Sequence, residues 1–204
     1  MASTNPQGSG PRLSDYIFDS GAYPFLAQGA PWTITDAAPR IVADLIATLG
    51  PGFQITDGVA VHRTAQVEAG AVLKGPVVIG ARSFVASSAY LRGGVFLAED
   101  CIVGPAAELK TSFMLPFSKL AHLNFVGDSI LGARVNCEAG SMIANYRNER
   151  ADKRIRIAWR GEVLDTSVEK FGALMGDGVR LGANAVVAPG AILEPGAIVR
   201  RLEL

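Results

Sequence analysis

Aliphatic residues recur every six positions along this chain. The first series contains nine of them without a break: Val61, Val67, Leu73, Ile79, Val85, Leu91, Leu97, Val103 and Leu109. A mostly small residue stands two positions before each of them. A period of six fits neither an α-helix, with its period of about 3.6, nor a half-buried strand, with its period of two. The series therefore predicts a repeat architecture in which each unit buries its apolar side against its neighbours.

The series resumes twice downstream in a changed register. Its second part contains Leu131, Cys137 and Ile143, and its third part contains Met175, Leu181, Val187, Leu193 and Val199. Because the second part is out of register with the first, we expect a loop within 110–128. The longer interruption before the third part predicts an inserted arm over 145–172. Apolar and basic residues alternate within that arm, which indicates a hairpin.

Six-residue faces can close into a triangular coil of about 18 residues, with the aliphatic residues pointing to the axis. Stacked coils then bury these residues as a continuous ladder. We expect glycine at the tight turns, where a positive φ is needed. This architecture explains why 23 of 204 residues are Gly while only 7% are aromatic. The predicted fold class is all-β, a parallel β-helix over 55–204.

The N-terminal residues lack the six-residue period. We expect a disordered tail over 1–12 and a helical cap over 13–54. Asp36 is a candidate N-cap for a helix that reaches about Leu49, with Gly50 just past its end. Such a helix is expected to seal the first coil against water and edge pairing. A role in substrate access is the alternative.

Charge and cysteine content exclude several classes of protein. Lys+Arg and Asp+Glu both total 19, so the net charge of zero disfavours broad binding to nucleic acid or membrane surfaces. No apolar run reaches the roughly 18 residues of a membrane span, and the first residues do not read as a secretory signal. Cys101 and Cys137 lie in the repeat, where buried free thiols are expected. Two Cys and two His make a zinc cluster unexpected, so we predict no metal and a cytoplasmic enzyme or binding protein.

The most specific motifs lie within 103–146. They read VGPAAELK at 103–110, AHLNFVGD at 121–128, VNCEAG at 135–140 and NY at 145–146. These motifs resemble the acetyltransferase domain of the bifunctional UDP-N-acetylglucosamine pyrophosphorylases/glucosamine-1-phosphate acetyltransferases, in which they read VGxxxExK, GHLxYxGD and VNxGAGxxxxNY. The resemblance is greatest to the archaeal-type members, covers about 55–204 and does not include the pyrophosphorylase domain. It implies the left-handed coils of hexapeptide acyltransferases and a homotrimer with sites between subunits.

Acetyl transfer from a thioester to an amine requires the amine to be neutral when it attacks. A histidine with a pKa near ~6.5 is mostly unprotonated at pH 7 and can accept the proton. By the resemblance, His122 is the catalytic histidine, and a packed or interface histidine is the alternative. His62 lies in an early coil away from the motifs. Glu108 is the candidate to orient His122 or Lys110, and a surface salt bridge is its alternative.

A sugar phosphate requires cationic and hydrogen-bonding partners. By the resemblance, Arg92 and Lys110 hold the phosphate, and both follow ladder positions, so we expect them to stack on one side of the prism. The resemblance implies further substrate contacts from Phe125, Asn136, Asn145 and Tyr146, and from Lys153 and Arg156 of the arm. A solvated charged face is the alternative for the last two residues.

Acetyl-CoA is the co-substrate that the resemblance implies. It would lie in the groove between subunits along the main chain of Ala139, Ala183 and Ala188. The backbone N–H groups near Ala139 and Gly140 are candidate donors to an oxyanion.

The sequence departs from the family motifs at two points: Phe125 stands where the family has tyrosine, and Glu138 stands where it has glycine. We also expect the basic C-terminal arm of the bacterial members to be missing. The first hypothesis is an N-acetyltransferase acting on an amino-sugar 1-phosphate in the synthesis of nucleotide-sugar precursors, with a separate nucleotidyltransferase as an expected partner. The alternatives are an acyltransferase acting on a nucleotide-linked amino sugar and a non-catalytic scaffold.

Overall fold

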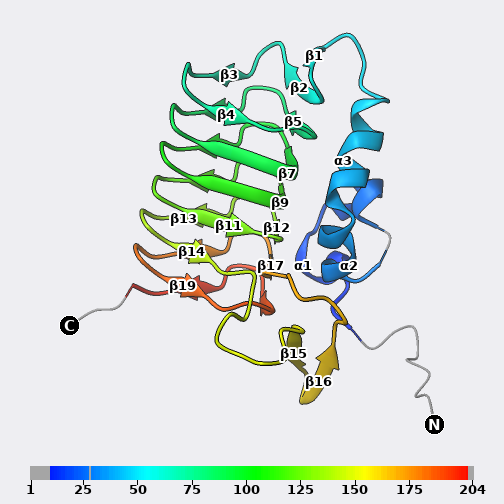
Figure 1. Ribbon diagram of the computed structural model, residues 1–204, viewed down its shortest axis with the longest axis vertical. Helices are drawn as coiled ribbons and strands as arrows, with labels where there is room; N and C mark the ends of the chain where they lie inside the picture. The colour runs from blue at the N-terminus through cyan, green and yellow to red at the C-terminus, as the bar shows by residue number, and fades with distance from the viewer. Residues whose placement is uncertain (1–9, 28, 202–204) are drawn as a thin grey trace.

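The computed structural model describes residues 10–27 and 29–201. Most of the predicted tail 1–12 therefore lies outside the described residues. The described chain forms a parallel β-helix with three faces (Figure 1). The predicted all-β class and the left-handed parallel β-helix with an inserted hairpin are confirmed.

The three faces are numbered here in the order in which the chain visits them. Face 1 contains β2 (Val59–His62), β5 (Val77–Ile79), the second halves of β7 (Tyr90–Leu97) and β9 (Glu108–Met114), β12 (Ile130–Leu131), β17 (Ala173–Met175) and β20 (Ala191–Leu193). Face 2 contains β3 (Gln66–Val67), β6 (Phe84–Val85), β8 (Ile102–Val103), β10 (Lys119–Leu120), β13 (Asn136–Cys137), β18 (Arg180–Leu181) and β21 (Ile198–Val199). Face 3 contains β4 (Val72–Leu73), the first halves of β7 and β9, β11 (Phe125–Gly127), β14 (Met142–Ile143) and β19 (Val186–Val187).

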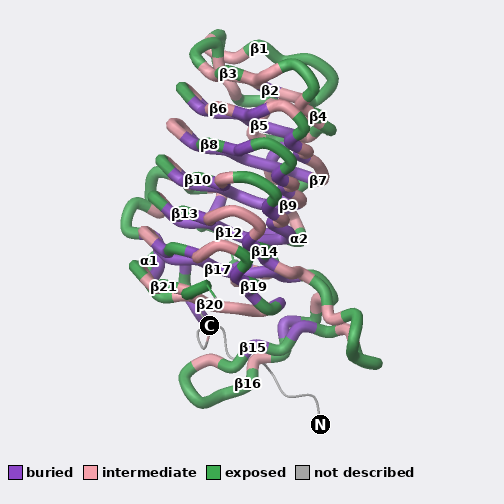
Figure 2. The backbone as a smooth tube through the Cα atoms, turned by 90° about the vertical axis from the view of Figure 1, so that its left-hand side faces the viewer, coloured by how far each residue is buried: buried purple, intermediate pink, exposed green. Residues whose placement is uncertain are grey.

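The predicted ladder forms the core of the prism. Leu97, Leu131 and Met175 of the predicted ladder stack in register on face 1 with Met114, which the predicted series did not include, and all four are fully buried. Equivalent stacks run through the other two faces, so buried residues follow the inside of the middle coils, whereas the first and last coils are only partly buried (Figure 2). Burial of these aliphatic side chains is the main stabilising contribution, at about 1.5–3 kcal/mol for each.

The loop expected within 110–128 is not present, and this prediction was wrong. Residues 110–128 continue the coils through β9, β10 and β11. The register changes because two turns are shorter. Thr111, with φ 52°, alone spans the turn that Gly93 and Gly94 span one coil earlier. A second short turn, at Asp128 with φ 46°, separates Val126 from Leu131.

Some glycines are required by close stacking rather than by a positive φ. A Cβ on Gly104 would lie 1.6 Å from the carbonyl oxygen of Ala121 in the next coil, and one on Gly80 would lie 2.6 Å from the carbonyl carbon of Ala98. Many turns instead place a non-glycine residue at positive φ, such as Ser88, Leu123 and Asn184. The expectation that glycine serves the turns is therefore only partly correct.

The N-terminal segment covers face 1 from its last coil to its early coils (Figure 1). Its helices are α1 (Leu13–Tyr16), the 3-10 turns η1 (Ser20–Ala22) and η2 (Pro24–Leu26), α2 (Pro31–Asp36) and α3 (Ala38–Ile46). Near the C-terminal end of the prism, the carboxylate of Asp177 accepts hydrogen bonds from the backbone N–H groups of Phe18 (2.9 Å) and Ala133 (2.7 Å). Further along, α3 contacts β5, β7 and β9.

The expected helical cap over the first coil was wrong in position. α3 begins at Ala38 without a side-chain cap, and Asp36 ends α2 instead. The helices lie along face 1 because its outward side chains are apolar: Val78, Phe96 and Phe113 are at most 8% exposed beneath the N-terminal segment. The first coil is instead closed by β1 (Phe53–Thr56), which pairs antiparallel with β2.

None of the helices in residues 10–27 and 29–201 has the length and apolar character that a membrane span requires.

Both cysteines are free and buried, as the repeat predicts. Burial raises the pKa of the Cys101 and Cys137 thiols to about 12. Because the thiolate is the reactive form, we expect neither thiol of the folded protein to react with Ellman's reagent at pH 8. Both should react after unfolding in guanidinium chloride. A thiol titrated rapidly under native conditions would contradict this expectation.

Candidate functional site

Face 3 carries two ion pairs from adjacent coils. Arg92 on β7 and Lys110 on β9 are in register, so these two cations stack as expected. The Arg92 guanidinium contacts the Glu108 carboxylate at 2.6 Å, with side chains 36% and 30% exposed. The Lys110 ammonium contacts the Asp128 carboxylate at 2.8 Å, with side chains only 17% and 6% exposed. The first pair is open to solvent, so Arg92 can give up Glu108 for a bound ligand. The second pair is held inside the protein.

His122 lies on the edge between faces 2 and 3, which we call edge 2/3. Its side chain is exposed, and the next residue, Leu123, turns the edge with φ 55° and is 61% exposed. The carbonyl of His122 accepts the N–H of Gly140 at 3.0 Å, and the carbonyl of Ala139 accepts the N–H of Asn184 at 2.9 Å. Successive coils thus bring His122, Ala139 and Ala183 to the same edge.

The third residue predicted to contact coenzyme A lies elsewhere. Ala188 follows β19 at the edge between faces 3 and 1, which we call edge 3/1. The carbonyl of Val187 accepts the N–H of Ala144, so Ala188 is one coil below Ala144. Edge 2/3 therefore holds two of the three predicted cofactor residues, and edge 3/1 holds the other.

A line of candidate residues crosses face 3 between the two edges. Phe125 and Glu108 are in register and form a column near His122. Arg92 and Lys110 lie two residues further along their strands, which corresponds to about 7 Å at ~3.3 Å per residue. The order across the face is therefore an imidazole, an aromatic ring beside a carboxylate, and two cations.

Two predicted contacts differ in the structure. Within the described chain, the Glu108 carboxylate is hydrogen-bonded to Arg92 (2.8 Å) rather than to His122 or Lys110. The N–H of Gly140 is already donated to the carbonyl of His122 and is not free for an oxyanion. Spacing along the chain could not show either contact, because both depend on which coils are stacked together.

Glu138 binds the backbone N–H of Ala183, a residue whose main chain is predicted to face coenzyme A. One of its carboxylate oxygens accepts the backbone N–H of Ala183 at 2.8 Å and contacts the Arg201 guanidinium at 2.7 Å. The first contact bridges two neighbouring coils on edge 2/3. A glycine at position 138, as in the family motif, would leave this N–H without its carboxylate partner.

Asn136 lies on face 2, not on the face that carries Arg92 and Lys110. It lines a shallow hollow of about 620 Å³. The residues around this hollow are cationic, aromatic or aliphatic, with one carboxylate and one amide: Arg82, Phe84, Asp100, Ile102, Phe117, Lys119, Arg134, Val135 and Asn136. The predicted site residues of one chain are thus divided between two faces.

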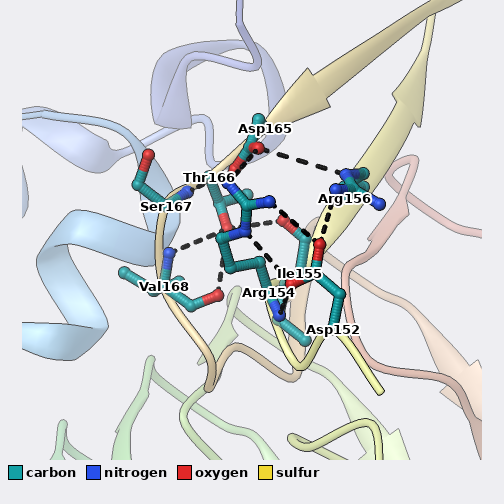
Figure 3. A network of polar contacts seen from close by, with 8 residues as sticks. All are labelled: Asp152, Arg154, Ile155, Arg156, Asp165, Thr166, Ser167 and Val168. Carbon is teal, nitrogen blue, oxygen red and sulfur yellow. Dashed lines mark hydrogen bonds and ion pairs between the residues drawn. The ribbon is translucent and has the colours of Figure 1, made fainter. Parts of the chain in front are cut away.

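The arm leaves and re-enters the prism at edge 3/1. It contains the antiparallel strands β15 (Arg156–Trp159) and β16 (Glu162–Asp165), with Ile155 and Ile157 buried. Its basic residues are largely committed to internal partners. Arg156 and Arg154 both contact Asp152, at 2.6 and 3.0 Å, in a network with Asp165 (Figure 3). These contacts hold the pKa of the Asp152 carboxyl well below its ordinary value, mainly through hydrogen bonding to Arg154.

The remaining predicted arm residues lie near its beginning. Asn145 donates a short hydrogen bond to Asp128, and Tyr146 is 36% exposed. The Lys153 ammonium lies 5.5 Å from the centre of the Tyr146 ring and donates to the carbonyl of Asn148 at 2.7 Å. Asp128 itself was not among the predicted site residues, although it ends the motif AHLNFVGD. Its position as the only charged residue in that motif was the available signal.

Comparison with known proteins gives matches to curated sequences and to solved structures, whereas no protein-family model matches the chain. A bifunctional sugar-1-phosphate nucleotidylyltransferase/acetyltransferase from Sulfurisphaera tokodaii is 33% identical over 167 residues, which is 79% of this chain and 41% of the relative. A bifunctional protein GlmU from Methanococcus aeolicus is 30% identical over 79% of this chain and 40% of the relative. The chain thus spans about two fifths of the length of these curated relatives.

A solved structure supports the fold alone. A putative acetyltransferase from Bacillus cereus superposes with a TM-score of 0.50 at 14% identity, over 67% of this chain and 69% of that chain. In fold, this chain is a left-handed parallel β-helix of the hexapeptide-repeat kind. In sequence, it resembles the acetyltransferase arm of the GlmU-type bifunctional proteins.

Proposed function

We propose that this chain transfers the acetyl group of acetyl-CoA to the amine of an amino-sugar 1-phosphate. The observation that carries the proposal is the order of groups across face 3: His122 at the edge, then Phe125 with Glu108, then Arg92. An amino-sugar 1-phosphate presents an amine, a ring and a phosphate that can follow the same line. The name of the Sulfurisphaera tokodaii relative, which joins sugar 1-phosphates to acetyl transfer, supports this substrate class.

In the proposed reaction, an imidazole nitrogen of His122 accepts a proton from the substrate amine. The amine nitrogen forms a bond to the thioester carbonyl carbon, and the resulting tetrahedral oxyanion collapses with cleavage of the C–S bond. Coenzyme A leaves as a thiolate that takes up a proton, and the amide product retains the acetyl group. The exposure of the His122 side chain leaves it accessible to both substrates.

Arg92 is the main proposed ligand of the phosphate. Its ion pair with Glu108 is about one-third exposed, so a phosphate can compete for a guanidinium that has five N–H donors. Lys110 contributes positive charge behind it. Asn145 and Tyr146 are proposed to contact the sugar, and Phe125 supplies an apolar surface beneath the ring without the hydroxyl of a tyrosine.

We propose a homotrimer with a site at each subunit boundary. Face 1 is covered by the N-terminal segment, whereas faces 2 and 3 expose apolar side chains such as Ile198 (56%), Met142 (46%) and Val186 (66%). A neighbouring prism would cover these residues and bring its own Asn136 toward the site. Light scattering is expected to give three times the 21.4 kDa of the chain, and a monomer would count against this assembly.

Acetyl-CoA is proposed to lie along edge 2/3 near Ala139 and Ala183, with Ala188 reached across the end of face 3. Small side chains there let an extended ligand approach the main chain. Free buried thiols also fit a cytoplasmic location, where acetyl-CoA is available and disulfides are rare. The acetylated product would be a substrate for a nucleotidyltransferase.

The proposal is tested by following free CoA thiol with acetyl-CoA and either glucosamine 1-phosphate or galactosamine 1-phosphate. We expect turnover with at least one of them. Absence of turnover with both, in a protein that is folded and trimeric, would rule out this substrate class. Thermal stabilisation by CoA alone would then separate another transferase from a non-catalytic scaffold.

A nucleotide-linked amino sugar is the second candidate substrate, and the hollow on face 2 favours it. Lys119 and Arg134 line this hollow together with the rings of Phe84 and Phe117. Cations beside aromatic rings suit a phosphate joined to a base. A preference of at least tenfold in kcat/KM for a UDP-linked amino sugar over the sugar 1-phosphate would favour this candidate.

Replacing Glu138 by glycine is expected to lower the KM for acetyl-CoA severalfold. The change frees the N–H of Ala183 from the carboxylate that now accepts it. The KM for the amino sugar should not change, which initial-rate kinetics with each substrate varied will show. Arg201→Ala is the matched control, because it removes the other partner of Glu138 and leaves the Ala183 contact in place. An unchanged KM for acetyl-CoA in Glu138→Gly would show that this N–H does not meet the cofactor.

A further inference from the structure

Asp128 is the only buried charged residue among those that the structure describes. Its carboxylate accepts two contacts from the Lys110 ammonium, at 2.8 and 3.1 Å, and one from the amide of Asn145. A buried carboxylate is stable only when it is paired and hydrogen-bonded. The carboxylate, the ammonium and the amide therefore fix one another's orientation at edge 3/1.

The same residue joins the two ends of the arm. The carbonyl of Asp128 accepts the N–H of Gly172 at 2.9 Å, and the carbonyl of Asn145 accepts the N–H of Phe171 at 3.1 Å. Packing is tight at both ends, since a Cβ on Gly172 would lie 2.2 Å from the carbonyl oxygen of Gly127. The arm thus leaves the prism at Asn145 and returns at Gly172, and both of these residues are hydrogen-bonded to Asp128.

We propose that Asp128 is a positioning residue for the sugar-phosphate site. It holds Lys110 and Asn145 in their orientations and thereby places Tyr146, the next residue of the arm, beside face 3. This inference rests on the proposed function. In this inference, the Lys110 ammonium stays paired with Asp128 and does not move toward the phosphate. Arg92 is then the cation that changes partners when the substrate binds.

The test is Asp128→Asn, which keeps the size of the side chain and removes its charge. We expect the KM for the amino-sugar 1-phosphate to rise at least tenfold, because a displacement of about 1 Å can cost a factor of ~10². The KM for acetyl-CoA should change much less than the KM for the amino sugar, since Ala139 and Ala183 on edge 2/3 are not altered. A double variant, Lys110→Met with Asp128→Asn, should recover part of the Tm lost in the single variant, because it no longer buries an unpaired ammonium.

The matched control is Asp177→Asn. Asp177 also anchors a separate segment to the prism, through the N–H of Phe18 and Ala133, but at a different edge. It is expected to lower Tm without changing either KM. If Asp128→Asn likewise lowered only Tm, or raised both KM values equally, Asp128 would be merely structural and the proposal would be overturned.

Hydrogen exchange provides a readout that does not depend on activity. Amides at the two ends of the arm, near Asn145 and Gly172, should exchange at least tenfold faster in Asp128→Asn than in the wild type, while β15 and β16 keep their own pairing. If the wild type showed no turnover, the proposed function would fail while this measurement still tested the anchoring. Unchanged exchange at both ends would overturn the anchoring.

Discussion

His122→Ala is expected to lower kcat/KM for the amino-sugar 1-phosphate by about 10²–10⁴, the usual contribution of a general base. The loss should fall mainly on kcat, because the proposed phosphate ligand Arg92 lies on another column of face 3 and continues to bind. The His122 side chain is exposed, so its removal should leave Tm nearly unchanged. Steady-state rates of CoA release over a range of both substrates measure these effects.

His62 is the matched control, since the chain has only two histidines. It lies in β2, where its ring contacts Phe53 with centroids 5.0 Å apart and its Nδ1 is hydrogen-bonded to Thr64. His62→Ala should keep full kcat even where it reduces stability. Full activity in His122→Ala would reject His122 as the base, whether or not acetyl transfer itself is observed.

Gly104→Ala is expected to destabilise the protein by about 3 kcal/mol, at the upper end for an overpacked position. The added Cβ would meet the carbonyl oxygen of Ala121 at 1.6 Å and the carbonyl carbon at 2.6 Å, both of them backbone atoms of the next coil. The two coils can relieve this overlap only by separating. Because Ala121 precedes His122, activity should also fall. Thermal unfolding should show a decrease in Tm of roughly 6–12 °C.

Gly50→Ala is the control for this substitution. No atom lies within 4 Å of a Cβ built on Gly50, so the change should alter the free energy of unfolding by less than about 0.5 kcal/mol. A stability loss below 1 kcal/mol in Gly104→Ala would mean that the coils are spaced more loosely than the structure indicates.

The repeat made the core predictable. Each ladder residue, such as Leu91 or Leu109, is buried by the residue one coil away, so a fixed spacing along the chain implies a fixed neighbour in space. The loop expected within 110–128 was wrong because a coil can lose one residue at a turn and remain stacked. Thr111 replaces a pair of glycines in this way, and counting residues cannot distinguish such a short turn from a loop.

The position of the N-terminal helices was less predictable. The apolar stripe of α3 showed that the helix must cover something, and the first coil was the nearest candidate. The outward residues Val78, Phe96 and Phe113 of face 1 carried the missing signal, since all three are apolar in successive coils. Their burial requires a cover along the prism rather than over its end.

The sequence by itself determined the repeat, the buried thiols and the motif around His122, because each of these depends on residue types at fixed spacings. Only the tertiary structure decided the partner of each charge. Glu108 is paired with Arg92, and Asp128 is paired with Lys110 and hydrogen-bonded to Asn145. These pairings join residues 16 to 18 positions apart. They depend on the length of each coil, since one residue more or less at a turn would bring a different side chain opposite each cation.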